Sequence, residues 1–207
     1  ILDNRVFTQI FLSICRILNR EKKGLAEDSI SEELQKIVTR DYSSNITKAA
    51  CNRAISWLYF SGIIGFCAKI TELDIMDFKA AGRCYFMDLG VANYYLKRTG
   101  TDERALRGTL NENYVFINLK KRQDFPPEIA FETPAFATYK GGEIDFVVQS
   151  LEGNRRCLVE VKTGKGKAET AVKALQSGKA DRLLYLKGDT KGGETGKIIT
   201  IPIYMLE

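Results

Sequence analysis

Two short apolar runs, each interrupted by one acidic residue, constrain the fold of this chain more than any other feature. Residues 144–148 read IDFVV and residues 157–161 read CLVEV, so both are rich in the β-branched and aromatic side chains that favour strands. Residues 151–154, which lie between them, include a glycine and an asparagine, as turns commonly do. The sequence therefore predicts an antiparallel hairpin with one acidic residue in each strand.

The length of the turn determines which residues of the hairpin lie opposite one another. If the loop is residues 151–154, Ser150 pairs with Arg155, and the pairs that follow place Asp145 opposite Glu160. Directly opposite residues have their β-carbons about 4.5–5.5 Å apart. Side chains alternate along a strand, so Lys162 is expected on the same face as Glu160. Four apolar neighbours are expected on the other face: Ile144, Phe146, Val159 and Val161.

Two opposed carboxylates destabilise a sheet unless a cation lies beside them. Lys162 is one candidate for that cation, and a divalent ion is the other. Mg²⁺ binds one or two carboxylates together with water, lowers the pKa of bound water and holds phosphate oxygens. The chain contains no histidine, which excludes imidazole-based triads, zinc sites that use histidine and histidine-metal nucleases. Asp145, Glu160 and Lys162 remain as candidate catalytic residues, with the two acids as metal ligands.

The motifs GGEIDF at residues 141–146 and LVEVK at residues 158–162 resemble those of the PD-(D/E)XK nuclease-like superfamily. The resemblance implies a core of a helix, a meander of strands, a helix and a final strand. It also implies Mg²⁺, or Mn²⁺ in its place, as the cofactor, and a lysine that positions the attacking water. The motif GTLNENYV at residues 108–115 resembles the first core helix, which by this likeness supplies Glu112 as a further acidic residue. Ile144 stands where the superfamily name has a proline.

The order of the motifs resembles a narrower family, the domain of unknown function that forms the C-terminal half of many prokaryotic AAA+ ATPases. This resemblance implies that the chain is a fragment of a longer polypeptide with an ATPase domain upstream. The chain itself lacks a nucleotide-binding P-loop, because Gly196-Lys197 is followed by Ile198, and no ATPase site is expected in it. The motifs, in order, are DLG at 88–90, EN at 112–113, EIDF at 143–146 and EVK at 160–162.

Three amphipathic helices are expected near the N-terminus. Residues 4–19 repeat apolar side chains at helical spacing. A second helix is expected to run to about residue 38, and a third to end at Gly62. Serine and asparagine are favoured at helix N-termini. The expected caps are Ser29 or Ser31 for the second helix and Ser44 or Asn45 for the third.

Two strands after these helices complete a winged-helix-like unit, residues 1–90. Residues 63–70 and 83–87 are the apolar runs, and a polar loop is expected to join them. The third helix is then the recognition helix of a DNA-binding unit. The alternative is a winged helix that docks proteins or acts as a spacer. The side chains expected to meet a DNA groove are Lys48, Asn52 and Arg53.

A helix and linker are expected over residues 91–108, with Asp88 as the N-cap, and the nuclease-like domain over residues 109–207. Pro134 predicts an edge strand or a bulge in that domain, and residues 187–197 predict a polar loop. The expected fold class is α/β (α+β). A winged-helix-like unit is followed by a restriction-endonuclease-like mixed sheet flanked by helices.

Glycines and lysines follow Lys162 in residues 163–167, just before a helix expected from about residue 168. Backbone amides at a helix N-terminus, together with lysine charges, hold phosphate groups in many proteins. Lys165 and Lys167 are therefore candidate nucleic-acid contacts. A solvated loop is the alternative interpretation.

Charge and cysteine content indicate the setting of the protein. The net charge of +5 and the isoelectric point near 8.9 are moderate and favour polyanions weakly. Five cysteines without a Cys-x-x-Cys pair indicate buried thiols in a reducing cytoplasm. No apolar run approaches the ~18 residues of a membrane span, so no membrane partner is expected. The oligomeric state stays open.

Three functions are consistent with these patterns. The first is a Mg²⁺-dependent nuclease domain that cleaves DNA and serves the upstream ATPase. The second is the same fold without turnover, which binds nucleic acid or a protein and regulates the ATPase. The third is a structural oligomerisation domain. Metal binding distinguishes the first from the second, and salt-dependent DNA binding distinguishes the second from the third.

Overall fold

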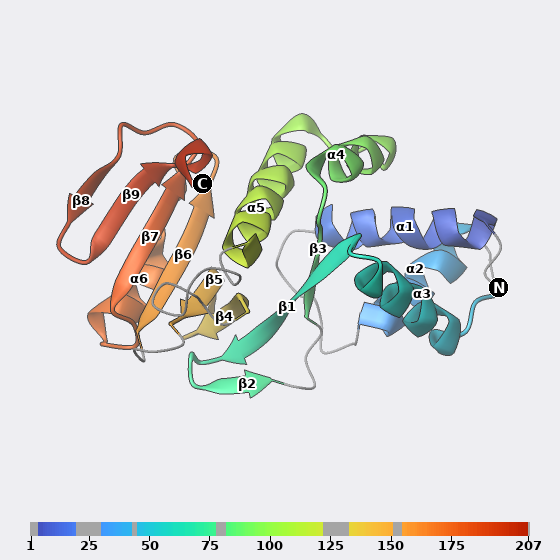
Figure 1. Ribbon diagram of the computed structural model, residues 1–207, viewed down its shortest axis with the longest axis horizontal. Helices are drawn as coiled ribbons and strands as arrows, with labels where there is room; N and C mark the ends of the chain where they lie inside the picture. Colours follow the sequence, from blue (N-terminus) through green and yellow to red (C-terminus); the bar gives the residue numbers. More distant parts are fainter. Residues whose placement is uncertain are drawn as a thin grey trace. The chain divides into compact units, whose positions relative to one another are not determined.

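The computed structural model describes residues 4–19, 30–42, 45–77, 82–121, 133–150 and 155–206 (Figure 1). The chain forms two compact units. The first consists of Ile1–Phe66 and Lys79–Leu110, and the second of Cys67–Phe78 and Asn111–Glu207. The combination of helices with a mixed sheet confirms the expected α+β class. The division into domains 1–90, 91–108 and 109–207 stays a prediction.

The first unit is mainly helical. Strand β3 (Arg83–Phe86) pairs in it with the beginning of β1 (Ile64–Thr71), and the Met87 amide donates a hydrogen bond of 2.9 Å to the Ile63 carbonyl. The helix expected over residues 4–19 is confirmed. The helices are α1 (Asn4–Asn19), α2 (Ile30–Tyr42), α3 (Lys48–Phe60), α4 (Leu89–Arg98) and the first residues of α5 (Glu103–Lys121).

The helix starts differ from those expected. Thr47, rather than Asn45, is the N-cap of α3, and its hydroxyl accepts a hydrogen bond of 3.1 Å from the Ala50 amide. Ser31 lies within α2, one residue after its start, so it does not cap that helix. Ser29 and Ser44 lie outside the described residues. The α2 helix also runs beyond residue 38 to Tyr42, because a charged final turn on an exposed face costs the helix little.

Gly62 ends the third helix as expected. Its φ is +68°, a left-handed conformation that costs glycine little, and its amide donates to the Tyr59 carbonyl at 3.0 Å. The core of this unit is built on aromatic contacts from separate elements. The Phe11 ring lies 5.1 Å from that of Phe86 and 4.6 Å from that of Tyr95. The apolar face of α1 therefore anchors β3 and α4.

Asp88 is the N-cap of α4, as predicted, because its Oδ1 accepts a hydrogen bond of 2.9 Å from the Val91 amide. We expect Asp88→Ala to lower the free energy of unfolding of the first unit by about 1 kcal/mol, the usual loss for a removed N-cap. Asp88→Asn keeps an acceptor oxygen and is the matched control, with a loss of a few tenths of a kcal/mol at most. The fluorescence of the single tryptophan, Trp57 of α3, follows the unfolding of this unit in urea. Equal losses in both variants contradict a capping role.

The second unit is built on a sheet whose strands lie in the order β2-β1-β4-β5-β6-β7-β9-β8. Its central pairs, β4 with β5 and β5 with β6, are antiparallel, whereas β6 with β7 and β7 with β9 are parallel. Helix α6 (Glu169–Gln176) connects β6 to β7. The strands are β2 (Ile75–Asp77), β4 (Ala135–Tyr139), β5 (Gly142–Gln149), β6 (Arg156–Lys162), β7 (Arg182–Lys187), β8 (Gly193–Thr195) and β9 (Ile198–Pro202), followed by the short helix η2 (Ile203–Met205).

Different helices lie against the two faces of this sheet. On one face, alanines and Leu175 of α6 share a buried cluster with Leu158 of β6 and Leu183 of β7. On the other face, the ring of Phe116 of α5 lies 6.3 Å from that of Phe146 of β5. Side chains on both faces of the central strands are therefore buried, and a charged residue among them needs a partner.

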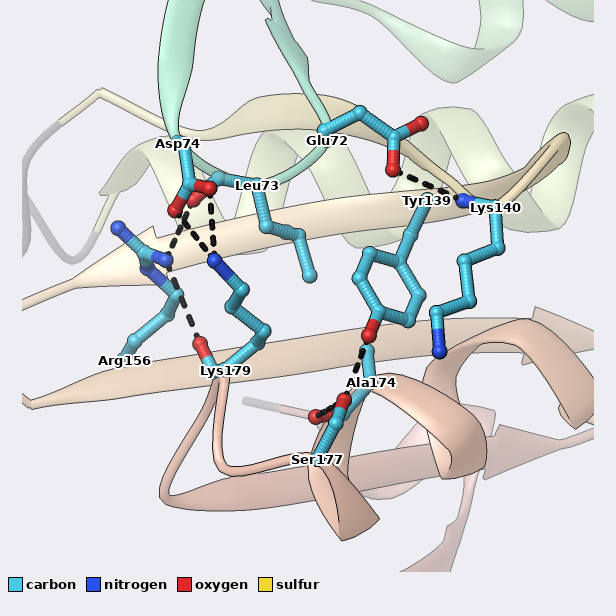
Figure 2. Close-up of polar contacts among 9 residues, drawn as sticks. All are labelled: Glu72, Leu73, Asp74, Tyr139, Lys140, Arg156, Ala174, Ser177 and Lys179. Carbon is cyan, nitrogen blue, oxygen red and sulfur yellow. Dashed lines mark hydrogen bonds and ion pairs between the residues drawn. The ribbon is translucent and has the colours of Figure 1, made fainter.

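The expected polar loop between residues 70 and 83 is wrong, because this segment contains strand β2 and a tight turn. Glu72 and Leu73 adopt left-handed φ values of +53° and +60°, and the Leu73 side chain is fully buried in the cluster on the α6 face. Figure 2 shows the polar contacts that hold the turn. Arg156 Nη1 donates to the Leu73 carbonyl at 2.6 Å, and Lys179 Nζ lies 2.6 Å from Asp74 Oδ2. Burial of one leucine thus outweighs the polar character of its neighbours.

Two further expectations change. Residues 187–197 are not entirely loop, since they contain β8, which pairs with β9. Pro134 does not mark an edge strand, because β4 begins after it and lies between β1 and β5. It does not mark a bulge in its own strand either, since the extra residue in the pairing of β4 with β5 belongs to β5. Among the described thiols, Cys51, Cys67 and Cys84 are buried as expected and Cys157 is half-buried, all without disulfides. Burial raises the pKa of Cys157 to about 11.

Candidate functional site

The pairing of β5 with β6 agrees with the register expected from the turn. Phe146 pairs with Val159 and Gln149 with Arg156, and the Ser150 amide donates to the Arg155 carbonyl at 2.9 Å. The described pairs end at Phe146 and Val159, one position before Asp145 and Glu160. The loop itself, residues 151–154, lies outside the described residues. The hairpin is thus aligned as predicted from Phe146 to Gln149, whereas the direct pairing of Asp145 with Glu160 stays a prediction.

Asp145, Glu160 and Lys162 meet at one point of the sheet, and we call them the Asp–Glu–Lys cluster. Lys162 Nζ lies 2.6 Å from Glu160 Oε2 and 3.3 Å from Asp145 Oδ2. Both acidic residues are only 2% exposed, whereas the lysine side chain is 27% exposed. One ammonium group therefore bridges two buried carboxylates and is the part of the cluster nearest to water.

An irregularity in β5 modifies the expected alternation of side chains. β4 pairs with β5 at Ala137–Ile144 and at Ala135–Val147, so two residues of β5 oppose one residue of β4 between those pairs. Paired residues share a face, and Ile144 lies in the same buried cluster as Val147, on the α6 face. The prediction that Ile144 lies on the same face of the sheet as Phe146 is wrong, because the extra residue shifts the alternation of side chains by one position.

The bulge falls at Asp145 and directs its carboxylate toward β6. Asp145 Oδ2 accepts a hydrogen bond of 2.8 Å from the backbone amide of Val161 and also receives the Lys162 ammonium group. Bulges often redirect a side chain at a functional site. Here the bulge places both carboxylates within reach of the same cation.

The electrostatics of the cluster favour a protonated Glu160. Burial and, after it, the neighbouring Asp145 carboxylate raise the pKa of Glu160 to about 8, against the opposing effect of the Lys162 ammonium group. Two carboxylates this close do not both ionise readily without a cation of sufficient charge. At neutral pH, therefore, one proton and one ammonium group together compensate the two acids.

The part of the chain that carries the cluster also matches a known family model. Residues 107–205 match the model of a domain of unknown function, DUF4143. The match covers β4 to β9, α6 and most of α5, so the whole Asp–Glu–Lys cluster lies inside it. No curated protein and no solved structure matches the chain. Within the described ranges, no helix combines the length and apolar character needed to cross a membrane.

The donor set of the DUF4143 region fits a magnesium ion. Two carboxylates from neighbouring strands, Asp145 and Glu160, are the hard oxygen ligands that Mg²⁺ uses together with water. Among the described residues, no group of three or more histidine, cysteine, aspartate or glutamate side chains is placed to hold a metal. The two acids are thus a pair. Glu112 lies half-buried on α5, and its contribution stays a prediction.

The residues expected to contact nucleic acid lie on exposed surfaces of both units. Asn52 and Arg53 are exposed on α3, and Lys48 at the start of that helix forms an ion pair with Glu32 of α2. Lys165 and Lys167 are exposed in the loop before α6, whose N-cap, Ala168, makes no side-chain cap hydrogen bond. Exposure permits DNA contact, which stays a prediction for all five residues.

Two residues beside the cluster, Tyr185 and Gly166, were not predicted from the sequence as part of the site. Tyr185 of β7 pairs with Glu160, and its hydroxyl donates a hydrogen bond to the Gly166 carbonyl. Gly166 in turn lies against the aliphatic part of Lys162. The sequence carries no clear signal for this contact, because the parallel register of β6 with β7 is set by packing of α6 and not by a short turn.

Proposed function

We propose that the DUF4143 region is a Mg²⁺-dependent nuclease domain that hydrolyses phosphodiester bonds of DNA. The observation that supports this proposal is the meeting of two buried carboxylates and one ammonium group at a single point of the sheet, with nitrogen–oxygen distances of 2.6 and 3.3 Å. Burial of Asp145 and Glu160 costs stability that an apolar pair of similar size does not. Such a cost is common where charged groups serve chemistry.

Each group of the cluster has a role in this proposal. Asp145 and Glu160 hold the metal ion, which, when bound, polarises the phosphate and acidifies a bound water. Lys162 donates a hydrogen bond to the attacking water and offsets negative charge that develops on the phosphate. The water oxygen bonds to phosphorus while the bond to the leaving oxygen breaks; the proton of the water passes to solvent, and the leaving oxygen takes up a proton from solvent. Glu160 first loses its own proton, so that both acids are charged.

The first test combines metal binding with cleavage. We expect Mg²⁺ or Mn²⁺ to raise the melting temperature of the parent, since a ligand at one hundred times its Kd adds about 2.7 kcal/mol to stability. Asp145→Asn and Glu160→Gln are expected to lose this shift and to cut DNA at least a hundredfold more slowly. Glu194→Gln, which changes an exposed carboxylate on β8, is the matched control and is expected to behave like the parent. Absence of any metal shift or cleavage in the parent contradicts the proposal.

A second candidate is a module that binds DNA without cleaving it. The observation that favours it is that the Lys162 ammonium group already contacts both acids, which are each only 2% exposed, so the cluster is closed and nearly inaccessible. In this case the five exposed residues described above hold the DNA backbone. Binding is then expected to weaken steeply as salt rises, without any dependence on Mg²⁺. The absence of salt-dependent binding leaves a structural or oligomerisation role.

We also propose an upstream AAA+ ATPase domain in the same polypeptide, in a reducing cytoplasm. The order of the four sequence motifs supports the ATPase, and the free thiols are consistent with the compartment. The coding sequence that precedes Ile1 tests this directly. A Walker motif there is the expected result, and a full-length reading frame without one contradicts it.

A further inference from the structure

The loop that follows β6 folds back over the side chain of Lys162. A β-carbon built on Gly166 lies 3.1 Å from Cδ and 3.6 Å from Cγ of Lys162, so the glycine backbone is packed directly on the lysine stem. The first distance is tighter than ordinary contact between carbon atoms and the second is an ordinary one, so a side chain at this position would press on the lysine stem. The position of the loop therefore restricts where the lysine ammonium group can be.

Tyr185 connects this loop to the sheet. Its hydroxyl donates a hydrogen bond to the Gly166 carbonyl. In the parallel pairing of β6 with β7 it lies beside Glu160, so both side chains are on the same face of the sheet. Burial raises the pKa of the Tyr185 hydroxyl, which keeps it protonated and able to donate at neutral pH. The Tyr185 hydroxyl thus contacts Gly166, and Gly166 in turn contacts the side chain of Lys162.

The backbone at the base of the loop is held independently. The Gly188 amide donates a hydrogen bond of 3.0 Å to the Lys162 carbonyl, and a β-carbon on Gly188 comes within 3.0 Å of the Thr163 carbonyl oxygen. This contact fixes the start of the loop but not Gly166, which is four residues after Lys162. Among the described residues, the hydrogen bond from the Tyr185 hydroxyl to the Gly166 carbonyl thus holds the far part of the loop to the sheet.

We propose that Tyr185 is a positioning residue for Lys162. Its hydroxyl keeps Gly166 on the lysine stem, and the stem then holds the ammonium group between Asp145 and Glu160. Any effect of Tyr185 on catalysis rests on the proposed function, whereas its effect on the position of the Lys162 side chain does not. Tyr185→Phe isolates the hydroxyl, because it retains the ring and its contact with the Lys187 ammonium group, 5.3 Å from the ring centre.

The reactivity of the Lys162 amine toward acetic anhydride measures how firmly it is held. Mass spectrometry gives the acetylation rate at each lysine of the intact chain, with Lys179 as the internal reference. We expect Tyr185→Phe to raise the rate at Lys162 roughly fivefold, the factor that corresponds to loss of a hydrogen bond worth about 1 kcal/mol. The rate at Lys179, which is bound to Asp74, is expected to stay the same.

Tyr139→Phe is the matched control. Tyr139 also uses its hydroxyl in this unit, at 2.7 Å from Ser177 Oγ after α6, and Figure 2 shows it beside the β1–β2 turn. Its loss is expected to leave Lys162 at the parental rate. Gly166→Ala supplies a second variant with the Tyr185 hydroxyl intact, and its added methyl group is expected to displace the stem and raise the rate at Lys162. An unchanged rate in Tyr185→Phe, or an equal rise in Tyr139→Phe, overturns the proposal.

The same variants separate this inference from the proposed nuclease activity. If the parent cleaves DNA, we expect Tyr185→Phe to lower kcat while KM for DNA and the Mg²⁺ midpoint stay near their parental values. If no variant cleaves DNA, a faster acetylation of Lys162 in Tyr185→Phe still supports the positioning role. If the parent cleaves DNA and acetylation is unchanged in Tyr185→Phe, the positioning role fails and the nuclease proposal stands.

Discussion

Lys162→Met is expected to lower the free energy of unfolding of the second unit by about 3 kcal/mol at pH 9. The substitution keeps most of the aliphatic stem but removes the ammonium group from two carboxylates that are each only 2% exposed. Breaking a buried ion pair by removal of one partner costs about 3–5 kcal/mol. The lower end applies because the lysine side chain is 27% exposed and water replaces part of the lost interaction. Above pH 8 Glu160 is ionised, so the loss is largest there.

Lys179→Met is the matched control for this prediction. Lys179 also binds a carboxylate at 2.6 Å in the same unit, but its partner Asp74 is 55% exposed and it is itself 36% exposed. Exposed ion pairs contribute about 0–1 kcal/mol, so the expected loss is below 1 kcal/mol. The single tryptophan lies in the first unit, so the unfolding of the second unit is measured by hydrogen exchange of the Val161 amide, which donates a hydrogen bond to Asp145. Equal losses in the two variants contradict a buried, mutually dependent cluster.

The hairpin was the most predictable part of the site because its determinants are local. The described register of β5 with β6 is the one expected from the sequence, and the Lys162 ammonium group lies at Glu160 as predicted. The direction of Ile144 was not predictable in the same way. It depends on the bulge between β4 and β5, and the pairing that creates this bulge is set by the neighbouring strand and not by the hairpin.

Elements fixed by distant contacts were the ones that the sequence did not predict. Leu73 lies in a polar segment, but its side chain fills the cluster on the α6 face of a sheet whose other strands begin about sixty residues later. Strand β8 is short and exposed and begins with a glycine, and it forms because β9 offers an open edge. The contact of Tyr185 with Gly166 depends on the parallel pairing of β6 with β7. In each case tertiary packing outweighs local preference.

Glu160 is expected to make the stability of the chain fall as pH rises from about 4.5 to about 8. Its pKa is raised from the ordinary value of 4.5 to about 8 in the folded protein, mainly by burial. Between these values the folded state holds a proton that the unfolded state has lost, so increasing pH favours unfolding. The slope approaches about 1.4 kcal/mol per pH unit within the window and returns to zero above it. Below the unfolded pKa both states are protonated, and the contribution of Glu160 no longer varies.

Glu160→Gln tests this expectation, because glutamine keeps the shape and polarity of a protonated glutamate but does not ionise. The difference in unfolding free energy between the variant and the parent is expected to change by a few kcal/mol in favour of the variant from pH 5 to pH 8. Urea denaturation at half-unit pH steps gives the curve, and Glu194→Gln on exposed β8 is expected to run parallel to the parent. A variant curve that also runs parallel to the parent means that Glu160 ionises in the folded state as it does in the unfolded one. The cluster then holds two negative charges at neutral pH, and a single ammonium group is not enough to balance them, so a divalent cation becomes the simplest remaining counter-charge.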